Sequence, residues 1–216
     1  MDILLTDSEA RVLGCLLEKE MATPDYYPLT LNSLLSACNQ KSNRNPVVSY
    51  DEETVRHALA ELQANRMVRQ SNVSRVPKYE QVFSDGLKLV PREKAILCVL
   101  LLRGPQTPGQ LRTHTHRLCE FSDADHVEET LKQLTERPDG PFVSKLPREP
   151  GKRESRFTHL FVDLDEAIPV SEDPEPVAPR SETPDRDPLQ DLERRVTALE
   201  QQLAALQARI PGPDGH

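Results

Sequence analysis

The residues in this chain that could do chemistry most directly are a short cluster of potential metal ligands, His114, His116 and Cys119. Residues two apart on a helix point about 200° away from each other, so the two histidines could not share a metal ion on a helix. The chain contains no phosphate-binding glycine loop, no G-x-S-x-G motif and no H-E-x-x-H motif, and spacing singles out no pair of acids. We therefore expect surface histidines, no metal, no cofactor, no catalytic residue and no enzymatic activity.

The cysteines indicate a reducing compartment. None forms a C-x-x-C pair, and Cys15 and Cys98 lie inside apolar helical runs, which favours buried thiols over disulfides. The first residues lack the basic region and long apolar stretch of a signal peptide, and the longest apolar run, 96–102, is too short to span a bilayer. The sequence therefore predicts a cytoplasmic protein with no membrane partner. The four cysteines are Cys15, Cys38, Cys98 and Cys119.

The formal net charge of −8 is unevenly distributed along the 216 residues. Residues 163–216 hold 13 acids and 5 Lys or Arg residues, whereas residues 1–162 hold 22 of each kind. Domains that bind nucleic acid are usually basic overall, and residues 1–162 are neutral. Any nucleic-acid contact must therefore be made by a local basic patch.

A weak internal repeat is the most informative feature of the chain. Residues 8–17 align with residues 92–101 at an offset of 84, and residues 54–62 align with residues 126–134 at an offset of 72. Both segments have helical spacing of apolar residues, and they occur twice in the same order. The pattern predicts a duplicated domain with a 12-residue insertion in the first copy.

The first copy is expected to contain three helices followed by a hairpin. Thr6 or Asp7 can cap the first helix and Thr30 the second, and the spacing of Ser49 and Glu52 is that of a capping box for the third. Extended segments at 67–70 and 79–83 then flank an eight-residue tip, 71–78.

The second copy repeats this order. Gly104 ends a helix over 92–103, Thr107 caps the next helix with Pro108 at its first position, and Ser122 caps a third that runs to about residue 136. Strands at 142–146 and 156–161 complete a second hairpin. The predicted fold class is mainly α with short β-hairpins (α+β), with two tandem winged-helix domains, 1–86 and 87–162.

The helix that contains residues 96–102 is apolar around its whole circumference. A surface helix keeps a polar face, whereas a helix that is apolar all round is covered on every side. We therefore expect this helix at an interface, either between the two domains or between two protomers.

The C-terminal part has a different character. Residues 163–188 are acidic and rich in proline, which predicts a disordered linker, and residues 189–211 have a heptad repeat, which predicts a coiled-coil helix. Leucine at every d position with some β-branched residues at a favours a parallel homodimer. The alternative is an amphipathic helix folded back on its own domains. The expected dimerisation residues are Leu189, Leu192, Val196, Leu199, Leu203, Leu206 and Ile210.

Four short segments resemble the bacterial YceH-like family. They are Glu9–Lys19, Cys38–Arg44, Leu102–Gly109 and Arg148–Arg156, which occur in the same order as in the family. The resemblance covers about residues 4–162. It implies a tandem winged-helix fold and implies little about activity.

Loops are better candidates for DNA contact than the third helices. No acid occurs in residues 27–50 or 62–79, whereas the third helix of the second copy carries several acids that would repel phosphates. We expect a DNA-associated accessory or regulatory homodimer; the alternatives are a protein-binding adaptor with no nucleic-acid role, or loops that are only solvated. The candidate contacts with double-stranded DNA are Lys41, Asn43, Arg44, Arg56, Arg75, Lys78, Arg148, Lys152 and Arg153.

Overall fold

A computed structural model describes residues 4–71 and 75–162 of the chain. The predicted linker and heptad segment, 163–216, lie outside the described residues, so the coiled coil and its seven dimerisation residues stay predictions. The described part consists of helices and short antiparallel strands, and both repeat copies belong to one compact unit. The predicted α+β class is confirmed, and the division into domains at 86/87 stays a prediction.

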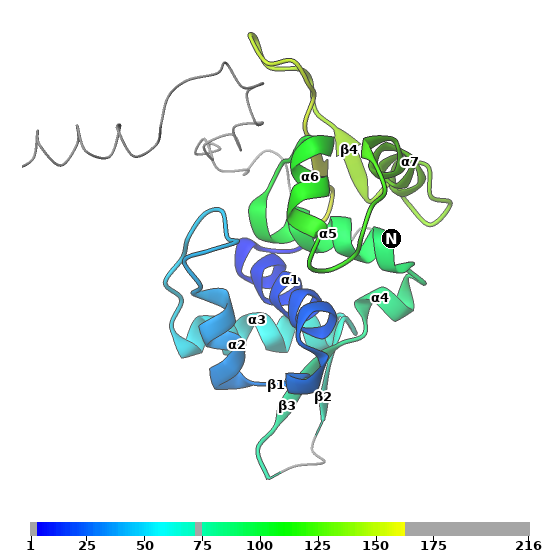
Figure 1. Cartoon of the computed structure of the whole chain (residues 1–216). Helices are drawn as coiled ribbons and strands as arrows, with labels where there is room; N and C mark the ends of the chain where they lie inside the picture. Colours follow the sequence, from blue (N-terminus) through cyan, green and yellow to red (C-terminus); the bar gives the residue numbers. More distant parts are fainter. Residues whose placement is uncertain (1–3, 72–74, 163–216) are drawn as a thin grey trace, which may run out of the picture. The chain divides into compact units, whose positions relative to one another are not determined.

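The first copy contains three main helices and a three-stranded sheet of order β1-β3-β2 (Figure 1). Strands β2 and β3 form an antiparallel hairpin, called hairpin 1, in which Arg69 faces Glu80. The elements are α1 (Asp7–Ala22), the 3₁₀-helix η1 (Pro24–Tyr26), β1 (Leu29–Thr30), α2 (Leu31–Cys38), α3 (Glu52–Ala64), β2 (Val68–Ser71) and β3 (Lys78–Gln81).

The second copy repeats the order of three helices and a hairpin after a short helix, α4 (Phe83–Gly86). Its hairpin, called hairpin 2, pairs β4 with β5, and Lys145 faces Phe157 in the register. The elements are α5 (Pro91–Arg103), α6 (Pro108–Thr115), α7 (Ala124–Thr135), β4 (Val143–Lys145) and β5 (Phe157–His159).

Three of the predicted helix caps are confirmed and two are wrong. Thr6, Thr30 and Thr107 each accept a hydrogen bond from the backbone of the third helical residue. The third helix of each copy is capped by Asp51 or Asp123 instead of Ser49 or Ser122. Each aspartate directly precedes the first helical residue, and its carboxylate accepts a backbone N–H at 2.8 Å, because charged acceptors suit a helix N-terminus.

The first helices of the two copies pack against each other at equivalent positions. The Sγ of Cys98 on α5 donates to the backbone oxygen of Gly14 on α1 at 3.5 Å, and these residues are 84 positions apart, which is the repeat offset. Residues 95–102 of α5 are all buried, because α1 covers one side while α6, α7 and β5 cover the other. The prediction that this helix is covered on all sides is confirmed, and the covering element is α1 of the same chain.

Gly14 permits this close approach, and its substitution is a test of the packing. A Cβ atom at Gly14 would lie 2.9 Å from Leu102 Cδ2 and 3.2 Å from Leu101 Cβ. Gly14→Ala should lower the free energy of unfolding by about 1–2 kcal/mol, because overpacking outweighs the helix-forming advantage of alanine. Gly109→Ala on α6 is the matched control, since only Thr107 Oγ1 at 3.9 Å is near, and it should raise stability by about 0.5 kcal/mol. Urea denaturation of the two variants checks the difference; equal effects would contradict it.

The two hairpins project from opposite ends of the compact unit (Figure 1). Hairpin 1 packs on α1 and α3, and hairpin 2 packs on α5 and α7. Because the copies meet through α1 and α5, each hairpin points away from the other copy. The two hairpin loops that were predicted to contact DNA therefore lie at opposite ends of the unit.

Candidate nucleic-acid interface

The loop from Asn39 to Tyr50 is fixed by side chains rather than by regular secondary structure. The Asn39 side chain donates to Tyr50 O and accepts from Tyr50 N, both at 2.8 Å. The buried guanidinium of Arg11 donates to Cys38 O at 3.3 Å and to Pro46 O at 2.6 Å. These hydrogen bonds hold the backbone of the loop in one conformation.

Arg44 is a correction to the predicted DNA contacts, because its side chain is fully buried. Its two terminal nitrogens bind the Glu18 carboxylate at 3.1 and 2.7 Å, and its remaining donors reach three oxygens of the loop and of α2. Burial alone would raise the pKa of Glu18, but the hydrogen bonds and charge of Arg44 outweigh burial and hold this pKa below its usual value. A guanidinium with all five donors bound cannot reach a phosphate, so Arg44 is a structural residue of the loop.

Lys41 and Asn43 remain exposed on this loop. Arg103, at the C-terminal end of α5, donates to Asn43 Oδ1 at 2.6 Å, and Asn45 N donates to Leu102 O at 2.9 Å. Of these two candidates, Asn43 is therefore held by the helix that begins the second copy.

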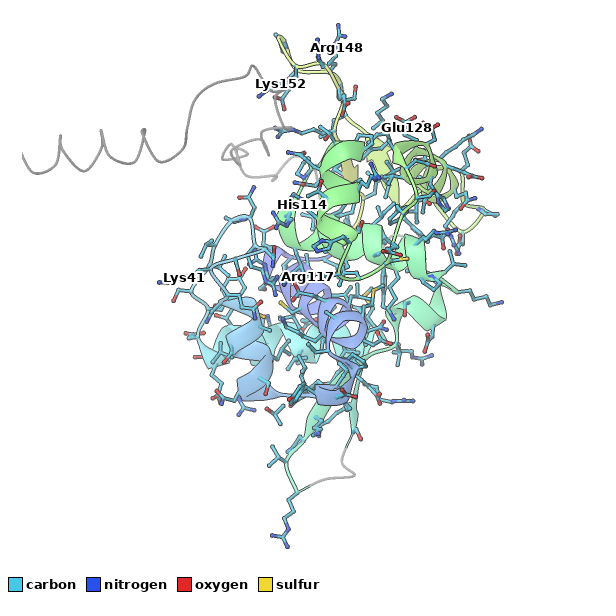
Figure 2. All side chains as sticks on the ribbon, in the orientation of Figure 1. Lys41, His114, Arg117, Glu128, Arg148 and Lys152 are labelled. Carbon is cyan, nitrogen blue, oxygen red and sulfur yellow. The ribbon has the colours of Figure 1, made fainter. Side chains whose placement is uncertain are left out.

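The other candidates lie on α3 and on the hairpins. Arg56 is exposed on α3, and its charge is paired with that of Glu52 at 2.6 Å. On hairpin 1, Arg75 is exposed and Lys78 is half-buried. On hairpin 2, Arg148 and Arg153 are exposed and Lys152 is half-buried. Hairpin 2 and hairpin 1 lie at opposite ends of the unit, and Lys41 lies between these ends (Figures 1 and 2).

Sequence reasoning missed three cations that follow the apolar part of α5. Residues 95–119 contain no acid and include Arg103, Arg112 and Arg117, of which the last two are exposed. Arg112 donates to Ser122 O at 3.1 Å, and Figure 2 shows Arg117 and His114 on the face that also carries Lys41. The absence of acids could have identified this segment, since the same criterion identified the loops of the first copy.

Backbone hydrogen bonds connect the segment after α5 to hairpin 2. Gln106 exchanges backbone hydrogen bonds with Phe157 of β5 at 3.0 and 2.8 Å, and the ammonium of Lys145 lies 5.8 Å from the centre of the Phe157 ring. The cations of the Asn39–Tyr50 loop, of the end of α5 and of hairpin 2 are together called the cationic strip. It consists of Lys41, Arg103, Lys145, Arg148, Lys152 and Arg153.

The helices that would enter a DNA groove in many winged-helix proteins have the opposite charge. The exposed side chains of α7 and its cap include five acids and one lysine, and those of α3 and its cap include four acids and one arginine. Acidic side chains at the N-terminus of a helix repel phosphates, so neither third helix is suited to insertion between two phosphate backbones. The acids are Asp51, Glu52, Glu53 and Glu61 on α3, and Asp123, Asp125, Glu128, Glu129 and Glu136 on α7.

The potential metal ligands do not form a site within residues 4–71 and 75–162. His114 Nδ1 is 2.9 Å from Gln106 Oε1, His116 is exposed, and no group of three possible ligands exists in this part of the chain. Cys15, Cys38 and Cys98 are buried free thiols and Cys119 is half-buried. Among the helices that the structure describes, none has the length and apolar character needed to cross a membrane.

The described residues thus define a mixed α+β protein with two copies of a three-helix and hairpin unit. A family model described as "Protein of unknown function, DUF480" matches residues 5–152. The UPF0502 protein of Aeromonas hydrophila is 47% identical over 227 residues that cover all of both chains. The UPF0502 protein YceH of Escherichia fergusonii is 46% identical, with 95% of this chain and 94% of the relative covered. The chain therefore belongs to the DUF480 family, and the resemblance to the YceH-like proteins is confirmed.

Proposed function

We propose that this protein is a non-enzymatic, cytoplasmic, DNA-associated accessory or regulatory factor that acts as a homodimer of tandem winged-helix chains. The observation that supports the proposal is the cationic strip, whose six cations come from both copies and lie on loops, on the end of α5 and on hairpin 2. Two acids, Glu149 and Glu154, lie on the tip of hairpin 2, and Glu149 is 3.9 Å from Arg156.

The strip is suited to the phosphate backbone rather than to the reading of bases. Its charged groups are Lys and Arg side chains on loops and a hairpin, which can neutralise phosphates without entering a groove. Asn43 is the one candidate with an amide that could contact a base edge, and Arg103 already occupies its oxygen. We therefore expect affinity for duplex DNA with little dependence on base sequence.

The salt dependence of binding tests this function. About five phosphate contacts predict that log K falls with log salt concentration with a slope near −4 to −5. The affinity of the full chain for a 20-base-pair duplex should be measured by fluorescence anisotropy between about 50 and 300 mM KCl. The double substitution Arg148→Glu and Arg153→Glu should weaken binding and reduce the slope by about 2.

Lys132→Glu on α7 is the matched control, because it reverses an exposed cation outside the strip and should leave the slope unchanged. Absence of binding at 50 mM KCl to duplex DNA, single-stranded DNA and RNA would remove nucleic acid from the function. If Lys132→Glu reduces the slope of log K against log salt concentration as much as the double variant does, DNA is attracted by net charge and not by the strip.

A protein-binding adaptor is the second candidate, and one feature of the first copy favours it. A cleft of about 480 Å³ lies between the end of α1, η1, β1, the start of α2 and β3. Tyr26 stands at this cleft with 79% of its surface exposed, and exposed tyrosines are frequent anchors in protein interfaces. Tyr26→Ala should leave DNA binding unchanged if the cleft serves a separate protein partner.

A further inference from the structure

We propose that Cys15 and Cys38 are a redox-active thiol pair, which a peroxide converts into a disulfide between α1 and the end of α2. This site goes beyond the proposed function and does not depend on DNA binding. Its basis is a cluster in the first copy, in which the two thiols lie among two guanidinium groups and one carboxylate. The cluster consists of Arg11, Cys15, Glu18, Cys38 and Arg44.

Contacts on both sides of Cys15 direct it toward Cys38. Arg11 lies one turn before Cys15 on the same face of α1, and its guanidinium donates to Cys38 O at 3.3 Å. Glu18 lies one turn after Cys15 and binds Arg44, which in turn donates to the backbone of α2 at 3.1 Å. Cys15 therefore faces the last turn of α2, where the thiol of Cys38 donates a hydrogen bond to its sulfur. Both thiols are fully buried.

The charges around the thiol pair favour a thiolate at Cys15. Arg11 is buried and donates to two backbone oxygens, but within residues 4–71 and 75–162 it forms no ion pair with a carboxylate. The carboxylate of Glu18 beside the pair is already bound by Arg44 at 2.7 Å. A buried charge without a counter-charge is costly, so a thiolate at Cys15 would balance the charge of Arg11.

The three buried thiols differ in their tendency to lose a proton. Burial raises the pKa of Cys15, but the hydrogen bond from Cys38 and the charges of the two arginines outweigh burial, so this pKa is lowered. The hydrogen bond that Cys38 donates and its burial both raise the pKa of Cys38. Burial also raises the pKa of Cys98, whose Sγ donates to Gly14 O at 3.5 Å. Cys15 is therefore the nucleophile, because the thiolate is the form that attacks an oxidant.

Access to the thiol pair is through the Asn39–Tyr50 loop. This loop directly follows Cys38 and contains no helix or strand, and Arg11 holds it to the cluster through the bond to Pro46 O at 2.6 Å. Local opening of a loop costs less free energy than global unfolding. A small oxidant such as hydrogen peroxide therefore reaches Cys15 without unfolding of the chain.

The oxidation consists of two steps. The thiolate of Cys15 attacks one oxygen of hydrogen peroxide, so that an S–O bond forms, the O–O bond breaks and hydroxide leaves; the product is a sulfenic acid. The sulfur of Cys38 then attacks the sulfur of Cys15, the S–O bond breaks, and the departing hydroxyl group takes the thiol proton of Cys38 to form water. The two thiols lose two electrons in total. The peroxide is reduced to two water molecules once the hydroxide takes up the proton that Cys15 had released.

The position of the disulfide in the oxidised full chain tests the thiol pair. The reduced protein is treated with hydrogen peroxide, catalase removes the oxidant, and iodoacetamide blocks the remaining thiols in denaturant. Peptide mass spectrometry then locates the disulfide. We expect a disulfide between Cys15 and Cys38 and a free thiol at Cys98.

The chain denatured in guanidinium chloride is the matched reference. Cys15 and Cys38 are 23 positions apart, and Cys98 and Cys119 are 21 positions apart. Loop closure therefore favours the two pairs almost equally in the unfolded chain, and both disulfides should form in similar amounts. Only the folded chain should select the pair of Cys15 and Cys38.

Three variants separate the roles within the cluster. Cys38→Ser should stop the reaction at the sulfenic acid of Cys15, which dimedone traps as a stable adduct. Cys98→Ser replaces an equally buried thiol and should form the disulfide as the parent does. Arg11→Met should move the midpoint of the rate against pH upward by about 1 pH unit, because it removes a nearby positive charge. Loosening of the loop alone would raise the rate at every pH and leave the midpoint in place.

Two results would overturn the inference. Similar yields of both disulfides in the folded chain, or a disulfide that contains Cys98, would show that oxidation follows unfolding. Absence of the disulfide between Cys15 and Cys38 in the parent, together with absence of a dimedone adduct in Cys38→Ser, would show that these thiols are an inert part of the core. Neither result bears on DNA binding, which the salt dependence tests separately.

Discussion

Replacing Arg44 with methionine should lower the free energy of unfolding by about 3 kcal/mol. The substitution leaves the Glu18 carboxylate, whose side chain is 13% exposed, without its main partner. Breaking a buried pair by removal of one partner costs about 3–5 kcal/mol. The lower value applies here because Lys19 still contacts Glu18 at 2.9 Å. Urea denaturation monitored by circular dichroism measures the change.

Arg56→Met is the matched control for this prediction, since Arg56 pairs with Glu52 at 2.6 Å in full contact with water. An exposed pair of this kind contributes about 0.3–0.5 kcal/mol, so the control should change stability by less than 1 kcal/mol. Addition of Glu18→Leu to Arg44→Met should recover part of the loss, because no unpaired charge then stays buried. A loss of less than 1 kcal/mol in Arg44→Met alone would show that the buried pair does not stabilise the fold.

The same residue shows why part of the site could not be predicted from the sequence. Arg44 lies among Asn, Gln and Lys residues in an acid-free stretch, which is the composition of an exposed loop. Its partner Glu18 is 26 residues earlier, in the last turns of α1. No local pattern connects two residues at this separation, so only the packing of α1 against α2 reveals the burial of Arg44. A charge reversal at Arg44 would weaken DNA binding through loss of structure and would falsely support it as a contact.

Features that depend on neighbouring residues were more predictable. Capping residues and the helical spacing of apolar residues predicted the order of three helices in both copies. The uniformly apolar segment of α5 correctly predicted a helix that is covered on all sides. Predictions were wrong at the ends of elements and where distant segments pair. Phe83 was expected at the end of a strand, yet it begins α4 and is buried. The two-residue strand β1 was not predicted, because its pairing with β3 spans about 50 residues and carries no local pattern.

The stability of the protein should also fall as the pH is lowered through the range in which histidine titrates. His159 on β5 is buried, and burial lowers its pKa from 6.5 to about 4. Its Nδ1 accepts a hydrogen bond from Phe161 N at 3.3 Å, and the ring is stacked on Phe161. The neutral ring is therefore the form that the fold accommodates, since a protonated Nδ1 could not accept this bond.

The sign follows from the protons bound in each state. Below pH 6.5 the unfolded chain protonates His159 while the folded chain does not, so unfolding becomes more favourable until the pH reaches about 4. The difference of about 2.5 pH units corresponds to roughly 3 kcal/mol, of which about 2 kcal/mol should be lost between pH 7.5 and pH 5. Stability at pH 5 is the more useful measurement, because carboxylates such as Glu18 and Asp123 add their own losses at lower pH.

His159→Asn isolates this contribution, because the amide oxygen can still accept from Phe161 N while the titrating ring is removed. The variant should start from a lower stability at pH 7.5 and then lose about 2 kcal/mol less than the parent on transfer to pH 5. His57→Gln on the exposed face of α3 is the control and should keep the pH dependence of the parent. If the His159→Asn variant and the parent lose the same free energy between these pH values, the ring of His159 accepts a proton inside the fold.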